Sequence, residues 1–160
     1  MGTVSAERVT AAAYGTVLIL AALPFIHPED VGDGVGWELI LGVGVATWLA
    51  HLFAEIVGDH VRHTAAAHER AEIARAMVDG LPILVAALVP AGALLLGRLE
   101  VLSGRGALWV ALTVAVVQLV GLGAFVGTLA TERHSERWLY AGATALFGLA
   151  VVTIKVVLGH

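Results

Sequence analysis

The sequence contains no cysteine. This absence excludes disulfide bonds, thiolate nucleophiles and cysteine-based metal sites, so a bound metal would need histidine, carboxylate or carbonyl ligands. Charge is also scarce, because 14% of the 160 residues are charged, against about 25% in a typical soluble domain. The formal net charge of −4 provides no basic surface for phosphates, which argues against nucleic-acid binding.

Familiar catalytic signatures are missing as well. The sequence has no HExxH helix, no phosphate-binding P-loop, no dinucleotide fingerprint, and no recognisable pairing of a nucleophile with a base. We therefore predict that the protein is not an enzyme. A signal-peptide cleavage site is missing too, since HPEDVGDG follows the first apolar run. We expect that run to remain in the mature protein.

What the sequence has in abundance is apolar residues, which make up 59% of the chain. They form runs of membrane-spanning length, and about 20 helical residues cross a hydrocarbon core. The pattern predicts an all-α, polytopic membrane protein in a lipid bilayer, with one membrane domain over residues 1–160. Five transmembrane helices are expected, at about 9–26, 37–60 with an extension to about 76, 78–97, 107–130 and 138–158.

Turn-forming residues suggest where these helices begin and end. Pro24 is expected to kink or end the first helix, and the acidic, glycine-containing segment 27–36 is expected to be an exposed loop. Asp79, Gly80 and Pro82 suit the N-terminus of the third helix, because a carboxylate faces the positive end of the helix dipole and proline fits the first turn.

The distribution of Lys and Arg predicts the orientation. With a cytoplasmic N-terminus, six basic residues lie inside and three outside, which favours an N-inside, C-outside bundle. The inside set is Arg8, Arg62, Arg70, Arg75, Arg133 and Arg137. The dominance of Arg, Ala, Gly, Val and Leu suggests a GC-rich bacterial genome, so we expect a multi-pass protein of the bacterial inner membrane.

The candidate site lies in the second apolar run, which contains more polar residues than the others. His51, Glu55, Asp59 and His63 follow one another at four-residue steps, which places them along one helix face. A charged residue at the centre of a membrane helix costs roughly 2.5 to 3.5 kcal/mol, so such a residue suggests function. Imidazole and carboxylate groups suit Zn²⁺, Fe²⁺ or Mn²⁺. The stripe predicts a divalent-cation or proton transporter with these four residues as metal ligands.

Further polar residues extend this hypothesis, and a simpler alternative stays open. Gln118, His60, His68 and Glu72 are candidates for an additional polar path. Alternatively, the protein is a non-transporting membrane scaffold or subunit, and the stripe fixes helix register or packs against a partner helix. Gly123 and Gly127 form a GxxxG pair that indicates close helix packing first and dimerisation second.

The segment WLAHLFAEIVGDHVRH and the linker TERHSERW carry a resemblance to the vacuolar iron transporter family. The resemblance implies a five-helix homodimer that exchanges Fe²⁺ or another divalent metal for protons, with Glu55 as the helix 2 glutamate. The family's first helix carries an aspartate in an Asn-Asp-Gly motif, whereas this sequence reads AAAYGTVLIL there. Because of this difference, the ion path that the resemblance implies would lack its first-helix ligand in this chain.

Overall fold

The computed structural model describes residues 6–62 and 69–130, together with 139, 142–144, 146, 148, 150 and 153. Over these residues every regular element is helical, which confirms the predicted all-α class. The elements are α1 (Ala6–Ala22), the 3-10 helix η1 (Leu23–Phe25), α2 (Pro28–Asp33), α3 (Val35–Arg62), α4 (Glu69–Arg98) and α5 (Gly104–Ala130).

Within the described residues, four helices are long and apolar enough to cross a membrane, judged by length and composition. They are α1, α3, α4 and α5. The multi-pass prediction is supported to this extent. The predicted fifth helix, 138–158, lies largely outside the described residues, and the N-inside orientation stays a prediction.

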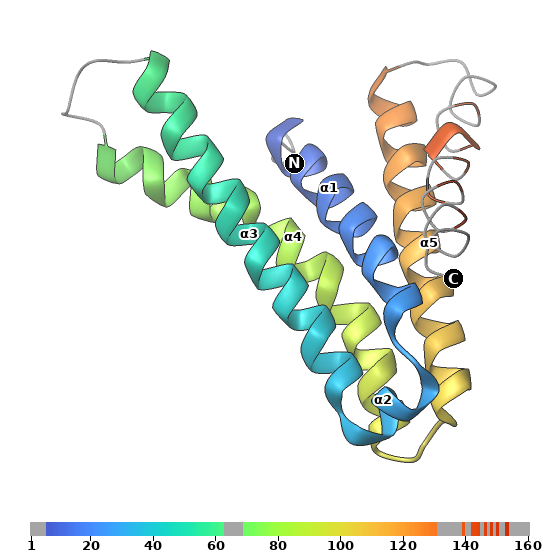
Figure 1. The fold of residues 1–160 in the computed structure, drawn as a ribbon. Helices are drawn as coiled ribbons and strands as arrows, with labels where there is room; N and C mark the ends of the chain where they lie inside the picture. Colours follow the sequence, from blue (N-terminus) through green and yellow to red (C-terminus); the bar gives the residue numbers. More distant parts are fainter. Residues whose placement is uncertain are drawn as a thin grey trace.

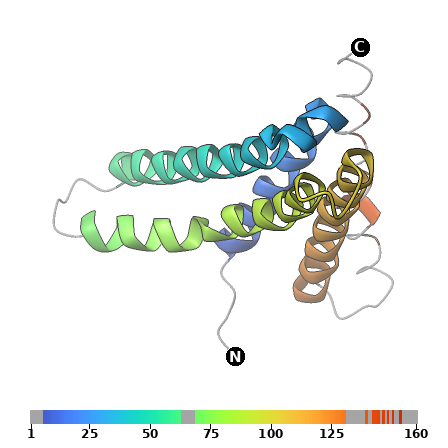
Figure 2. The ribbon, with the colours of Figure 1, turned by 90° about the horizontal axis from the view of Figure 1, so that it is seen from below.

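Helix α4 lies at the centre of the bundle. Half of its apolar span is buried, against 17% of the α3 span. Figure 1 shows the long helices converging at the end that holds α2 and spreading apart toward the other end. Figure 2 shows α3 and α4 lying side by side along most of their length. The buried core includes Leu20, Leu23, Val31, Ile40, Leu94, Ala107 and Ala111, and it therefore lies mainly at the convergent end.

The prediction for the first helix end is confirmed, but the loop predicted after it is wrong. Helix α1 ends at Ala22 and Pro24 lies in η1. Segment 27–36 contains α2, which has Pro28 in its first turn. The backbone N–H of His27 donates to Asp30 Oδ2 at 2.7 Å, so one of the acidic side chains that suggested a loop caps the helix instead.

The predicted extension of the second helix to residue 76 is wrong. Helix α3 ends at Arg62, and residues 69–76 form the first turns of α4. These residues, ERAEIARA, are mostly strong helix formers, so either assignment is compatible with their propensity. The structure assigns them to α4, which begins at Glu69, before its apolar span starts at Ile73.

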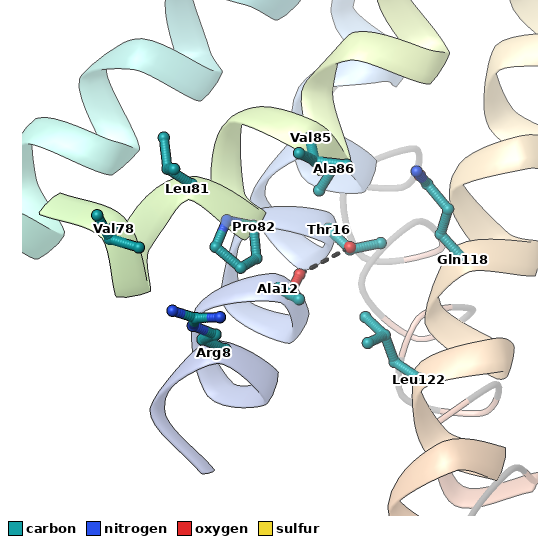
Figure 3. Close-up of a pocket in the computed structure, with 10 residues that line it drawn as sticks. All are labelled: Arg8, Ala12, Thr16, Val78, Leu81, Pro82, Val85, Ala86, Gln118 and Leu122. Carbon is teal, nitrogen blue, oxygen red and sulfur yellow. Dashed lines mark hydrogen bonds between the residues drawn. The ribbon is translucent and has the colours of Figure 1, made fainter. Parts of the chain in front are cut away.

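Asp79, Gly80 and Pro82 therefore lie inside α4 and not at its start. The proline ring removes a backbone donor, and membrane helices tolerate this where neighbouring groups compensate. Trp48 Nε1 on α3 donates to the Met77 carbonyl at 3.2 Å, one position before the Val78 carbonyl that loses its helical donor at Pro82. Figure 3 shows the ribbon of α4 bending between Val78 and Pro82.

The glycine-rich face of α5 packs within the chain. A Cβ atom on Gly123 would lie 2.9 Å from the Thr144 Cβ atom, a distance at which one of the two segments would have to move. This contact favours the predicted helix-packing role of the GxxxG pair, and dimerisation through it stays a prediction.

Candidate functional site

The polar stripe on α3 brings two of its four predicted ligands together. His51 Nε2 lies 3.8 Å from Glu55 Oε1, and the two side chains are 18% and 44% exposed. One helical turn separates them, which is the spacing at which side chains meet. The pair offers two residues to a metal ion, whereas catalytic and structural Zn²⁺ sites use three or four.

His51 also contacts α4. A Cβ atom on Gly80 would lie 2.9 Å from Trp48 Cδ1 and 3.3 Å from His51 Cδ2. A glycine is required there because these two α3 side chains fill the space above it. The sequence suggested a helix start at Gly80, but in the structure this residue lies inside α4 at a close contact with α3.

The other predicted ligands and path residues on this segment have side chains outside the described part of the chain. Asp59 and His60 belong to α3 and Glu72 to α4, but their side chains fall outside the described part of the chain, and His63 and His68 fall outside it entirely. Among the side chains that are described, no three His, Asp or Glu residues gather as a metal site. A metal centre on α3 stays a prediction.

A second polar contact joins α1 and α4, and the sequence analysis missed it. Arg8 Nε donates to Asp79 Oδ1 at 2.7 Å, and the carboxylate side chain is 15% exposed. The two residues stand 71 positions apart, each near the edge of an apolar run. Opposite charges at the edges of two apolar runs are weak evidence for an ion pair, since most such residues simply face solvent.

Next to this ion pair, a cavity of about 430 Å³ opens between α1, α4 and α5. Figure 3 shows side chains from these three helices around it. Its walls are mostly apolar, and the polar lining residues are Arg8, Thr16 and Gln118. The lining residues are Arg8, Ala12, Thr16, Val78, Leu81, Pro82, Val85, Ala86, Gln118 and Leu122.

The two polar groups deeper in the cavity differ in how they are satisfied. Thr16 Oγ1 donates to the Ala12 carbonyl at 2.8 Å within α1. Gln118 Oε1 is buried and accepts no hydrogen bond from the described residues. This oxygen therefore does not make the hydrogen bond between helices that polar side chains in membrane helices often make. Buried polar atoms without partners are rare in folded proteins and require an explanation.

Of the four residues of the additional polar path, only Gln118 has a side chain within the described part of the chain. Gln118 lines the α1/α4/α5 cavity, whereas neither His51 nor Glu55 does. The residues therefore belong to two separate places on either side of α4. Of these two places, the one with Gln118 is lined as a cavity by three helices.

Comparison with known proteins adds no relative. No protein-family model matches the chain, and neither a curated protein nor a solved structure is significantly similar to it.

Proposed function

We propose that this protein is a multi-pass membrane protein that binds a small, largely apolar molecule in the cavity between α1, α4 and α5. The volume of about 430 Å³ lies within the range of roughly 300 to 1,000 Å³ that is typical of ligand pockets. Such pockets are mostly apolar and carry a few polar groups that fix the orientation of the ligand. The composition of these walls supports that class of site.

The observation that carries the proposal is the cavity itself, which has one amide side chain, Gln118, in an otherwise largely apolar wall. The Oε1 atom of this amide is buried without a partner among the described residues, and leaving a buried acceptor unsatisfied costs roughly 1 to 3 kcal/mol. A leucine at this position would avoid that cost in a helix that is otherwise almost wholly apolar. A functional role beside the cavity accounts for an amide at this position.

Photolabelling of the detergent-purified protein tests this proposal. An octyl diazirine should label cavity-lining peptides from α1, α4 and α5 in a saturable manner, and unlabelled octane derivatives should compete. Ala12→Phe fills the cavity and should remove most of this labelling. Val117→Phe is the matched control, because Val117 lies on the same helix as Gln118 but is 63% exposed and does not line the cavity. Labelling that never saturates, or that Ala12→Phe leaves unchanged, would contradict the proposal.

A second candidate function is the transport of a divalent cation (Fe²⁺, Mn²⁺ or Zn²⁺) or of protons along α3, in a bacterial inner membrane and by a homodimer. The contact of His51 with Glu55 inside an apolar span favours it, since intramembrane carboxylates are often functional. The resemblance to the vacuolar iron transporter family points the same way. Glu55, however, lies on the half-exposed surface of α3 and not in the cavity.

The scaffold alternative uses the same surface. Helix α3 has the smallest buried share among the four candidate spans of the described chain. A partner helix or a second copy of the chain would cover Glu55 there. A flux assay on Glu55 variants separates this alternative from transport, as described below.

A further inference from the structure

The cavity has a charge at one end, and that charge is positive. Among the described residues that line the cavity, Arg8 is the only charged one. Its partner Asp79 does not line the cavity, and the Asp79 side chain is 15% exposed, against 46% for the Arg8 side chain. The ion pair therefore presents its cation, and not its anion, to a molecule in the cavity.

The contact with Asp79 does not use the full binding capacity of the Arg8 side chain. A guanidinium group has five N–H donors in a planar arrangement, and the contact joins Nε to one carboxylate oxygen, Oδ1, at 2.7 Å. Guanidinium groups bind carboxylate and phosphate groups through pairs of parallel hydrogen bonds. Arg8 can therefore bind a second anionic group while it keeps its contact with Asp79.

The rest of the cavity does not suit a charged group. Thr16 lies eight residues further along α1, which corresponds to about 12 Å of helix rise, and its hydroxyl donates to the Ala12 carbonyl. Gln118 is a neutral amide on α5, across the cavity from α1 (Figure 3). The other described lining residues are apolar. Because an ion in apolar surroundings is costly without a partner of opposite charge, an anion is stabilised only beside Arg8.

We infer that the cavity binds an anionic amphiphile, a molecule with an apolar chain between α1, α4 and α5 and a carboxylate or phosphate head group at Arg8. This inference rests on the proposed function, because it assigns the chemical class of the molecule bound in the same cavity. Two sources supply this chemistry in a bilayer, free fatty acids and anionic phospholipids. Basic pockets between membrane helices are known to bind anionic lipid head groups.

The test measures how well single-chain competitors prevent the octyl diazirine from labelling the cavity peptides of the purified full-length chain. Dodecanoate is compared with dodecanamide, and lysophosphatidylglycerol with lysophosphatidylcholine of the same chain length, at a mildly alkaline pH that ionises the carboxylate head. We expect the anionic member of at least one pair to reach half-maximal competition at a concentration roughly three- to tenfold lower than its partner. This preference should shrink at high salt, since Arg8 is partly exposed.

Variants of Arg8 test whether this residue is the source of the preference. In Arg8→Gln the preference should disappear while labelling by the octyl diazirine persists. Arg8→Gln combined with Asp79→Asn should give the same result, and it excludes repulsion by an unpaired carboxylate as the cause. The double variant also serves if the single variant does not yield folded protein. Arg105→Gln is the matched control, because it removes the same charge at an exposed residue of α5 that does not line the cavity.

The outcomes separate the inference from the proposed function. If the octyl diazirine does not label the cavity in a saturable way, the proposed binding function fails. If labelling saturates but neither anionic competitor is preferred, the cavity binds apolar molecules and the assignment to anionic amphiphiles is wrong. A preference that survives in both Arg8 variants would also overturn the assignment. A preference confined to dodecanoate identifies fatty acids as the source, and one confined to lysophosphatidylglycerol identifies phospholipids.

Discussion

The two ends of the helix bundle differ in what holds the helices together. At the convergent end, α2 fills the space between the long helices, and buried residues such as Leu23, Val31 and Leu94 pack around it. At the splayed end, the helices are joined by single polar contacts, Arg8 with Asp79 and Trp48 with Met77. Figure 1 shows the separation of the helices at that end. The comparison suggests that stability is concentrated at one end, which leaves the other end free to enclose a cavity.

The polar contacts at the two ends also serve different groups. At the convergent end, Arg98 Nη1 donates to the Asp33 carbonyl at 2.6 Å and so satisfies the C-terminus of α2. Gly34 follows with φ +87°, directly beneath the Arg98 side chain. At the splayed end, polar side chains link one helix to another. Side chains bond to backbone carbonyls at both ends, at Asp33 and at Met77, and the splayed end adds the ion pair of Arg8 with Asp79.

The largest effect on stability is expected for Gly34→Val at the convergent end. A β-branched residue at positive φ is strained, and its side chain would displace Arg98 from the Asp33 carbonyl. We expect the free energy of unfolding to fall by about 3 kcal/mol, measured by circular dichroism during unfolding in dodecyl sulfate. Gly32→Val is the control, because a Cβ atom there meets nothing within 4 Å. Equal losses from both variants would show that the positive φ of Gly34 and its contact with Arg98 do not set the stability of this end.

A smaller loss is expected for Asp79→Asn at the splayed end. The substitution leaves Arg8 without its carboxylate partner, but the Arg8 side chain is 46% exposed and can be solvated. We expect a loss of about 1 to 2 kcal/mol in the same unfolding assay. The exchange Arg8→Asp with Asp79→Arg should recover part of it, since the charges are then paired again. A loss larger than that of Gly34→Val would reverse the comparison between the two ends.

The sequence predicts the spans better than it predicts their contacts. Apolar runs of about 20 residues indicate membrane helices through hydrophobicity alone, and four of the five expected runs lie within long helices of the described chain. Helix ends were less predictable. Pro82 looks like a helix start in the sequence, but it lies inside α4, where the preceding turn packs against Trp48 of α3. Propensity carries no information about that partner.

Only the contact between residues that are close in the sequence could be predicted for the candidate site. The contact between His51 and Glu55 follows from helical spacing, and the structure confirms it at 3.8 Å. The pairing of Arg8 with Asp79 depends on which helices become neighbours, and a single sequence does not contain that information. Gln118 was noticed as a polar residue in an apolar helix, but its unpartnered oxygen becomes apparent only when α1 and α4 are placed around it.

The smallest effect on stability is expected for Glu55→Gln on α3. The carboxylate is 44% exposed and its contact with His51 is long, so the free energy of unfolding should change by less than about 0.5 kcal/mol. The same substitution also tests whether α3 transports cations. If α3 carries cations, Mn²⁺ or Zn²⁺ uptake by proteoliposomes should be lost in Glu55→Gln and retained in Glu38→Gln, a second exposed glutamate on the same helix. A stable variant with unchanged uptake would remove Glu55 from any transport site. A variant that loses more than 1 kcal/mol of stability would instead indicate that Glu55 is held by a partner helix, as the scaffold alternative requires.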